Sequence, residues 1–320
     1  RRNLQRPEQI TSFSYDEERR LFHDDRSLKY FHAPPMKVDL GRGMENLRER
    51  DPTRNEHLDS LLYSLMHLAA STPDGSSDFP RRRADVITWR GMATKLFSAL
   101  YEEQNTFSMN VMLVNDTLYI EEWVSLEAKA AKEKQMQDER QRRMGYYGYA
   151  FESWCTHSRD VSRGERIDFD YAHDDPWDGD VNTNVQWCSV VKTKLGELRL
   201  ILGGEVDCVD PRPPAPDTTS TAGAPPPALV ELKTTAVLRR PQDEVHFEKK
   251  MLRFFLQSYL LGVDRVLVGF RDQRGFLQAT HEFKTVEMPG LLKGKPHAWD
   301  RGGCCNLAWA ILNFVRERVR

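Results

Sequence analysis

Apolar residues recur at helical spacing between Asn55 and Ala70. Positions three or four apart fall on one side of an α-helix, so this segment is predicted to be an amphipathic helix with its leucine stripe packed inward. Segment length and flanking breakers predict further helices elsewhere. They cover Gly91–Tyr101, Leu126–Arg143, Ala150–Thr156, Glu244–Gly262 and Asn306–Arg318.

Strands are predicted where β-branched and aromatic residues form short runs bounded by turn residues. Ala84–Trp89 and Leu229–Val237 are single strands of this kind. Three pairs of runs are close enough to form hairpins, and two of these turn tightly at Asn115-Asp116 and Gly196-Glu197. The pairs are Phe107–Val114 with Thr117–Val124, Val185–Leu195 with Leu198–Val209, and Arg265–Arg271 with Phe276–Lys284.

Two segments interrupt this pattern. Gly145 and Gly148 are predicted to break the chain between the helices Leu126–Arg143 and Ala150–Thr156. Asp210–Pro227 is rich in Pro, Ser, Thr and Ala, and is predicted to be a flexible surface insertion because it has too little apolar surface to order itself.

The irregular order of strands, hairpins and helices favours an α+β fold with mixed, largely antiparallel sheets flanked by helices. The unusual motifs are spread from Arg90 to Gln257. If they meet at one site, residues 1–320 form a single domain.

Composition narrows the classes of protein. Charged residues make up 29% of the 320 residues, and the longest apolar runs are far shorter than a membrane span, so no membrane segment is expected. The five cysteines are an odd set without a C-x-x-C pair, which favours a reducing compartment and argues against a zinc site. The net charge of −2 indicates no polyanion partner by itself, although basic runs at Arg81–Arg83 and Lys249–Lys250 could form a local patch.

Acidic residues stand at strand spacing in two places. In Gly203-Gly204-Glu205-Val206-Asp207, alternation along a strand puts Glu205 and Asp207 on one face. In the same way, Glu231 and Lys233 share a face on the strand Leu229–Val237.

Crowded carboxylates repel one another, and a bound cation relieves the repulsion. All-oxygen ligands favour magnesium, manganese or calcium, and such an ion activates water and holds phosphate. The alternative is that both motifs are ordinary strands with solvated polar faces. Together they resemble the acid and E-x-K core of the PD-(D/E)XK nucleases.

A longer motif makes the resemblance more specific. Residues 145–152 match the G-Y-x-G-x-x-F-E motif of the DXO/Rai family of RNA decapping nucleases at every fixed position. Other signatures of that family are matched by Arg90 in Thr-Trp-Arg-Gly, by the E-x-D and E-x-K pairs, and by a helical Gln257. The resemblance spans most of the chain and implies a single catalytic domain with a PD-(D/E)XK nuclease-like core.

The resemblance also implies roles for individual residues. Glu152, Asp207 and Glu231 would coordinate Mg²⁺ or Mn²⁺ together with the Leu232 carbonyl, and Glu205 would bind the metal or its water. Lys233 and Gln257 would contact the scissile phosphate or the attacking water, and Arg90 would hold RNA phosphates. Each has a simpler interpretation: Glu152 as a helix cap, Gln257 as an exposed helix residue, and Arg90 as a partner of any surface acid. Four aromatic residues are assigned to the core: Tyr146, Phe151, Trp154 and Trp187.

The function implied by the resemblance is hydrolysis at RNA 5′ ends. The reactions are removal of pyrophosphate from 5′-triphosphate RNA, excision of unmethylated, incomplete or NAD-type caps, and 5′-to-3′ exonuclease activity. An accessory role, stabilising an Xrn-type nuclear 5′-to-3′ exoribonuclease, is the alternative, and an exposed apolar patch away from the acids would support it. A DNA nuclease of the wider PD-(D/E)XK class is the third possible function. The resemblance places the protein in the nucleus.

Overall fold

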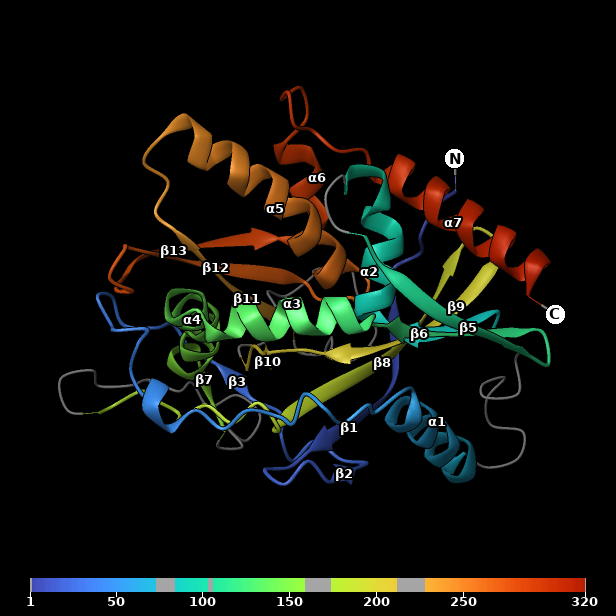
Figure 1. Cartoon of the computed structure of the whole chain (residues 1–320), viewed down its shortest axis with the longest axis horizontal. Helices are drawn as coiled ribbons and strands as arrows, with labels where there is room; N and C mark the ends of the chain where they lie inside the picture. The colour runs from blue at the N-terminus through green and yellow to red at the C-terminus, as the bar shows by residue number, and fades with distance from the viewer. Residues whose placement is uncertain (1, 73–83, 103–105, 159–173, 212–227, 320) are drawn as a thin grey trace, which may run out of the picture.

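Two β-sheets form the centre of the molecule, which is a computed structural model of the chain (Figure 1). The structure describes residues 2–72, 84–102, 106–158, 174–211 and 228–319. The first sheet has seven strands in the order β2-β1-β8-β9-β4-β6-β5. Its strands are β1 (Glu8–Tyr15), β2 (Leu21–Phe22), β4 (Val86–Trp89), β5 (Ser108–Val114), β6 (Thr117–Trp123), β8 (Gln186–Leu195) and β9 (Leu198–Glu205).

The second sheet has six strands in the order β13-β12-β11-β10-β3-β7. In both sheets antiparallel pairs predominate, while β4 is parallel to β9 and β6, β11 to β12, and β3 to β10. The predicted mixed, largely antiparallel α+β fold is therefore confirmed. The strands of the second sheet are β3 (Tyr30–Phe31), β7 (Thr156–His157), β10 (Cys208–Val209), β11 (Leu229–Ala236), β12 (Arg265–Arg271) and β13 (Leu277–Lys284).

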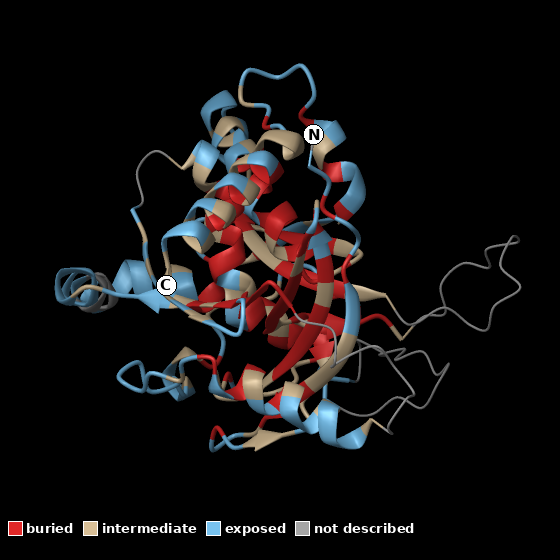
Figure 2. Cartoon of the chain, turned by 90° about the vertical axis from the view of Figure 1, so that its right-hand side faces the viewer, coloured by how far each residue is buried: buried red, intermediate tan, exposed pale blue. Residues whose placement is uncertain are grey.

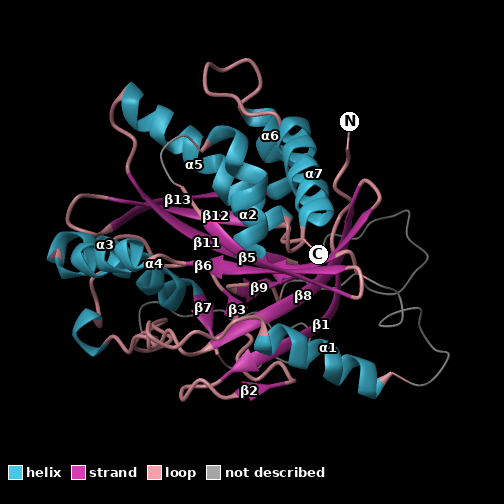
Figure 3. Cartoon of the chain, turned by 45° about the vertical axis from the view of Figure 1, so that its right-hand side comes forward, coloured by secondary structure: helices cyan, strands magenta, loops and turns pink. Residues whose placement is uncertain are grey.

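Helices cover both faces of the sheets. Helices α2, α5, α6 and α7 gather on one side, and α1 lies on the other, against β1 (Figures 1 and 3). Buried residues concentrate in the strands between these layers (Figure 2). The helices are α1 (Asp59–Ser71), α2 (Arg90–Ser98), α3 (Leu126–Gln137), α4 (Glu139–Cys155), α5 (Pro241–Tyr259), α6 (Met288–Leu291) and α7 (Arg301–Arg318).

The three predicted hairpins are present. In the β5–β6 hairpin, Asn115 and Asp116 have φ angles of 49° and 62°, the left-handed conformation that a tight two-residue turn requires. Gly196 at the β8–β9 turn also has a positive φ, of 61°. No strand is predicted before Ala84, whereas β1 pairs along β8 and β2 extends the same sheet.

The predicted strand Leu198–Val209 is in fact two strands in different sheets. β9 ends at Glu205, and β10 begins at Cys208 in the second sheet. The strand ends because its partner ends: the Val206 N–H still donates to the Trp187 carbonyl, at 3.2 Å, but β8 begins only one residue earlier. The chain therefore crosses from one sheet to the other through Val206 and Asp207.

The predicted break at Gly145 and Gly148 is wrong. α4 runs through both glycines, and the break lies instead at Asp138, whose carboxylate accepts hydrogen bonds from two N–H groups of the first turn. Each glycine costs a helix roughly 1 kcal/mol relative to alanine. Burial of one face of α4 against the second sheet offsets this cost. That face includes the predicted core residues Tyr146, Phe151 and Trp154.

Two segments singled out in the sequence lie outside the described residues in whole or in large part. Arg81–Arg83 is one, and most of the Asp210–Pro227 insertion is the other. The five cysteine thiols are all free and buried. Every helix in the described ranges is too short or too polar to cross a membrane.

Candidate active site

The predicted acidic residues meet where the two sheets join. Glu205 is the last residue of β9, and Asp207 lies in the crossover that follows it. Glu231 belongs to β11 of the second sheet, and Glu152 comes from α4, which packs on that sheet. Four elements that are distant in the sequence therefore contribute the cluster.

The edge of β11 is free beside this cluster. β10 pairs only with Leu229 and Val230, and beyond Val230 the described residues place no further strand on that side of β11. The Leu232 backbone N–H, which would otherwise belong to a strand ladder, donates to Asp207 Oδ2 at 2.6 Å. The crossover is thus tied to the free edge of β11, and the Leu232 backbone lies next to the acidic cluster.

Alternation along β11 puts Glu231 and Lys233 on the same face, as predicted. Lys233 Nζ donates to Glu231 Oε1 at 2.5 Å, and Arg90 Nη1 lies 3.4 Å from the same oxygen. Glu231 is 1% exposed, and its buried Oε2 has no hydrogen-bond partner in the described part of the chain. Burial alone would raise the pKa of Glu231, but Lys233 and Arg90 outweigh it and the pKa is lowered.

Arg90 reaches the cluster from the start of α2, directly after β4. Its Nη2 also donates to the Glu205 backbone carbonyl, at 3.4 Å. A Cβ on Gly204 would stand 2.9 Å from the Arg90 Cβ. The absence of a side chain at Gly204 is therefore what lets the arginine pass so close to β9.

The other three carboxyl groups have raised pKa values. Burial is the main cause for Glu152, and the neighbouring Asp207 adds to it. Burial and the charge of Glu231 raise the pKa of Asp207 to about 7. Burial also raises the pKa of Glu205, against the lowering effect of Arg90. The cluster thus carries mutual repulsion that a cation would relieve.

These residues fit a hard divalent cation. The donor atoms are all oxygens, and one of them, the buried Glu231 Oε2, has no partner within the described ranges. Within the described part of the chain, no three acidic, histidine or cysteine side chains already stand at the spacing of a closed metal site. An ion would therefore bind only after side chains of the cluster adjust, and Glu231 Oε2 could serve as a ligand while Oε1 keeps its contact with Lys233.

Gln257 lies on α5 beside a cavity next to the acidic cluster. That cavity, of about 410 Å³, is lined by Gln257, Arg90 and Glu205. A cavity of about 290 Å³ on the other side of Glu205 is lined by Glu152 and Asp207. The structure therefore places Gln257 near Arg90 and Glu205, and Glu152 near Asp207, with Glu205 between the two groups.

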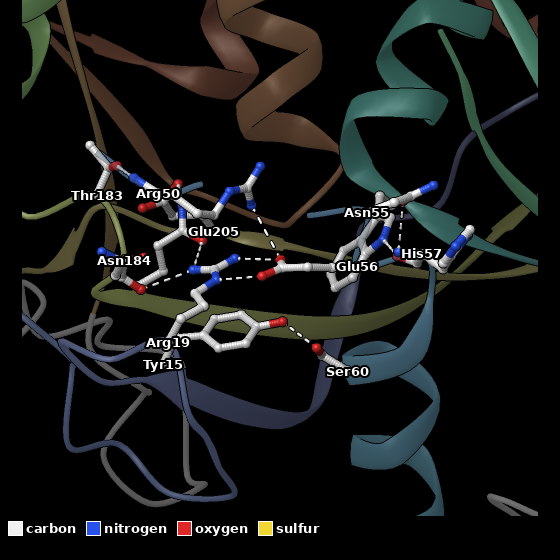
Figure 4. A network of polar contacts seen from close by, with 12 residues as sticks. Tyr15, Arg19, Arg50, Asn55, Glu56, His57, Ser60, Thr183, Asn184 and Glu205 are labelled. Carbon is white, nitrogen blue, oxygen red and sulfur yellow. Dashed lines mark hydrogen bonds and ion pairs between the residues drawn. The ribbon is translucent and has the colours of Figure 1, made fainter. Parts of the chain in front are cut away.

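A part-buried polar network, which no sequence pattern predicts, holds the Glu205 side chain (Figure 4). Gln186 Nε2 donates to Glu205 Oε2 at 2.8 Å, and Gln186 Oε1 accepts from Arg19 Nη1 at 2.6 Å. The Arg19 guanidinium makes two parallel hydrogen bonds to Glu56, at 2.8 and 2.9 Å, and stacks 3.6 Å from the ring centre of Tyr15. Arg19 belongs to the charged run Glu17–Arg20, and such runs usually face solvent, so the sequence offers no signal for it.

Mixed sheets with an E-x-D acid pair at the end of one strand and E-x-K on another define a nuclease of the PD-(D/E)XK class. The chain belongs to the RAI1-like PD-(D/E)XK nuclease family, whose model matches residues 5–320. The resemblance stated from the sequence is therefore confirmed.

The names of similar proteins agree with this family assignment. "Decapping nuclease RAI1" of Mycosarcoma maydis is 36% identical over 373 residues, covering 99% of this chain and 72% of the relative. "Decapping and exoribonuclease protein" of Bos taurus is 33% identical over 321 residues, covering 98% of this chain and 76% of the relative.

The fold has solved counterparts. Rai1 of Scheffersomyces stipitis, in complex with (3′-NADP)+ and a calcium ion, superposes with a TM-score of 0.82 at 26% identity. That match covers 98% of this chain and 83% of the other. Divalent metal binding is thus a property of the family.

Proposed function

We propose that this protein is a metal-dependent hydrolase acting on RNA 5′ ends, within a single catalytic domain. It removes pyrophosphate from 5′-triphosphate RNA and excises unmethylated, incomplete or NAD-type caps. The observation that carries the proposal is the acidic cluster at the free edge of β11, in which Glu231 is buried, with Lys233 beside it. The names of the fungal and bovine relatives support RNA as the substrate.

We propose Mg²⁺ as the resident ion, with Mn²⁺ as a substitute. Glu152, Asp207 and Glu231 would hold it together with the Leu232 carbonyl, and Glu205 would bind it directly or through water. When bound, such an ion lowers the pKa of water and offsets charge on the phosphate. Oxygen-only ligands and phosphate chemistry both favour Mg²⁺.

The protein's own cations would bind and orient the substrate. The Lys233 ammonium, held against Glu231, is placed to orient the attacking water and to offset negative charge that develops on the phosphate. Arg90 presents a planar fork suited to phosphate oxygens. Gln257, in the cavity beside Arg90, would contact the scissile phosphate or the water.

The range of substrates follows the relatives. The Scheffersomyces stipitis protein binds (3′-NADP)+, which supports NAD-type caps as substrates here. The name of the bovine relative supports exoribonuclease activity in addition to decapping, and the 5′-to-3′ direction is part of the proposal. Single-stranded 5′ ends are commonly recognised by stacking and backbone contacts, so one site could serve these reactions.

We also propose a nuclear location and a complex with an Xrn-type 5′-to-3′ exoribonuclease. An apolar groove of about 1020 Å³ between α1 and the β5–β6 hairpin supports a partner surface away from the acids. Met66 and Met112 on its rim are 65% and 64% exposed. Replacing both with aspartate should weaken association with such an exoribonuclease in a pull-down, while decapping by the isolated protein stays unchanged.

The test of the catalytic proposal is product analysis on matched RNAs. The 5′ ends to compare are triphosphate, unmethylated cap, methylated cap, NAD cap and monophosphate, each with and without Mg²⁺, beside the Glu231→Gln variant. Pyrophosphate or cap fragments released only by the wild type with metal would support the proposal. Cleavage of duplex DNA but no RNA would point instead to a DNA nuclease. If the folded protein cleaves neither RNA nor DNA, the accessory role is the explanation that remains.

A further inference from the structure

A cavity at the amino-terminal end of α4 is lined by an unusual group of arginines. It has a volume of about 1020 Å³ and includes Arg140 and Arg143 of α4, Arg271 at the end of β12, and Arg274 of the following turn. Within the described residues none of the four forms an ion pair, although arginines elsewhere in the chain commonly do. Asp272, which stands between Arg271 and Arg274 in the sequence, offsets part of this positive charge through space.

Two acids also line this cavity, Asp138 and Glu139. Asp138 is already engaged, because its carboxylate accepts from the N–H groups of Arg140 and Gln141 at 2.9 and 3.2 Å. Glu139 is exposed in the first turn of α4. The four arginines therefore still outnumber the acids around them, which are Asp138, Glu139 and the neighbouring Asp272.

Arg271 shows the imbalance most clearly. Its guanidinium lies 4.6 Å from the ring centre of Tyr147, and its buried Nε has no hydrogen-bond partner among the residues that the structure describes. Burial lowers the pKa of Arg271. Partial burial and the charge of Arg271 together lower the pKa of Lys250 on α5, so Lys250 adds a further cation near the cavity. An anionic ligand would compensate all of these groups.

Three elements lead from the acidic cluster toward this cavity. On α4, Glu152 and the cavity residue Met144 are eight positions apart, which is about 12 Å of helix. On β11, the step from Leu232 to the cavity residue Ala236 is about 13 Å. On α5, Lys250 lies seven positions before Gln257, on the same helix face and about 10 Å away.

We propose that the arginine cavity binds backbone phosphates of the RNA segment adjoining the 5′ end that is held at the acidic cluster. This inference rests on the proposed function, since it takes RNA as the substrate. The separation of about 10 to 13 Å along these elements is short enough for one RNA strand to continue from the acidic cluster into the cavity. Arginine forks favour phosphate oxygens, and the aromatic ring of Tyr147 is already covered by Arg271, so the site holds the backbone and does not read bases.

The test measures RNA binding in EDTA, where no turnover occurs. Fluorescence anisotropy would compare a single-stranded RNA of about ten nucleotides with a dinucleotide, on wild type, Arg143→Gln and Arg274→Gln. Arg142→Gln is the matched control, because Arg142 precedes Arg143 on α4 but does not line the cavity. We expect Kd for the long RNA to rise roughly tenfold in the combined Arg143→Gln/Arg274→Gln variant, and the log–log salt slope to fall by roughly 0.7 per lost phosphate contact. Dinucleotide binding and the control should not change.

Other outcomes would overturn the inference. One is that Arg142→Gln and Arg143→Gln weaken long-RNA binding equally, and another is that the dinucleotide loses as much affinity as the long RNA. A third is that an oligoglutamate peptide binds this cavity more tightly than RNA does, which would mark a protein-binding site. If the wild type cleaves no RNA but the binding differences remain, the proposed function fails and the arginine site stands. If cleavage is present without the binding differences, only this inference fails.

Discussion

The Asp207 carboxylate accepts a hydrogen bond of 2.6 Å from the Leu232 backbone N–H, across the junction of the two sheets. This contact fixes one carboxylate oxygen of Asp207 against β11 and leaves the other available to the cluster. The Leu232 carbonyl lies on the same strand, next to Glu231. Both proposed metal donors on β11 are therefore held in register with Asp207.

Asp207→Ala should abolish turnover while the fold is retained. It removes a proposed metal ligand and the acceptor of the Leu232 N–H, so the rate should fall far more than tenfold, or over about 1.4 kcal/mol of barrier. Single-turnover assays on 5′-triphosphate RNA would measure this, and circular dichroism would check the fold. Wild-type activity in a folded Asp207→Ala protein would show that the site has been placed wrongly.

Arg19→Gln should weaken metal binding although Arg19 is not one of the proposed metal ligands. Arg19 holds Gln186, which holds Glu205, and the loss of such supporting contacts typically costs roughly 10–100-fold in metal affinity or activity. The measurement is the Mg²⁺ concentration that gives half-maximal activity. Arg20→Gln is the control, because Arg20 is an exposed neighbour paired with Asp16.

Arg19→Gln also removes a buried ion pair with Glu56, so a loss of stability alone would be ambiguous. Gln186→Leu separates the two effects, because it cuts the link to Glu205 and leaves the Arg19 to Glu56 pair intact. An unchanged Mg²⁺ requirement in Gln186→Leu would show that the network stabilises the fold and does not affect metal binding.

Metal ions should stabilise the protein more at high pH than at low pH. Burial and Glu231 raise the pKa of Asp207 to about 7, and the pKa of Glu152 is raised as well. An acid whose folded pKa exceeds its unfolded pKa stabilises the fold at low pH, and this contribution is lost as pH rises through the folded value. Without metal, the contribution of Asp207 is therefore full below about pH 4 and gone above about pH 7.

Divalent ions bind the deprotonated carboxylates and relieve their repulsion. The rise in Tm on adding Mg²⁺ should thus be larger near pH 8 than near pH 5.5, as measured by differential scanning calorimetry. Asp207→Asn should remove most of that difference. An equal rise in Tm at both pH values in the wild type would contradict the prediction.

Two glycines should respond to alanine in opposite ways. A Cβ on Gly269 of β12 would stand 2.6 Å from the ring of Phe151, which is fully buried, so Gly269→Ala should cost about 1–3 kcal/mol of unfolding free energy. For Gly148 in α4, no atom of the described residues lies within 4 Å of such a Cβ, so Gly148→Ala should gain up to about 1 kcal/mol. Urea denaturation would measure both. Destabilisation by Gly148→Ala would mean that α4 needs a glycine there for packing.

The parts of the site that follow from strand periodicity could be predicted from sequence. Alternation along β11 put Glu231 and Lys233 together. The same alternation, applied to β9, grouped Glu205 with Asp207 even though β9 ends between them. The end of β9 could not be foreseen, because it depends on where its partner β8 begins. The continuity of α4 through its glycines likewise depends on burial against a sheet that the local sequence does not describe.

The support for Glu205 escaped prediction for a different reason. Arg19 finds its partners Glu56 and Gln186 at separations of 37 and 167 positions. Local charge patterning carries no information about such pairs. The arginine cavity is similar, because the basic run Lys249–Lys250 hinted at a patch, but its principal members come from α4 and the β12–β13 hairpin.

The crossover at Val206 and Asp207 has a consequence for how activity arises during folding. Arg90 and Glu231 are in contact across 141 positions, and Asp207 and Leu232 across 25. Contacts between distant positions require large loops to close, so they form slowly. Neither sheet alone contains a working set of side chains, and recovery of catalysis after dilution from denaturant should therefore lag behind recovery of secondary structure.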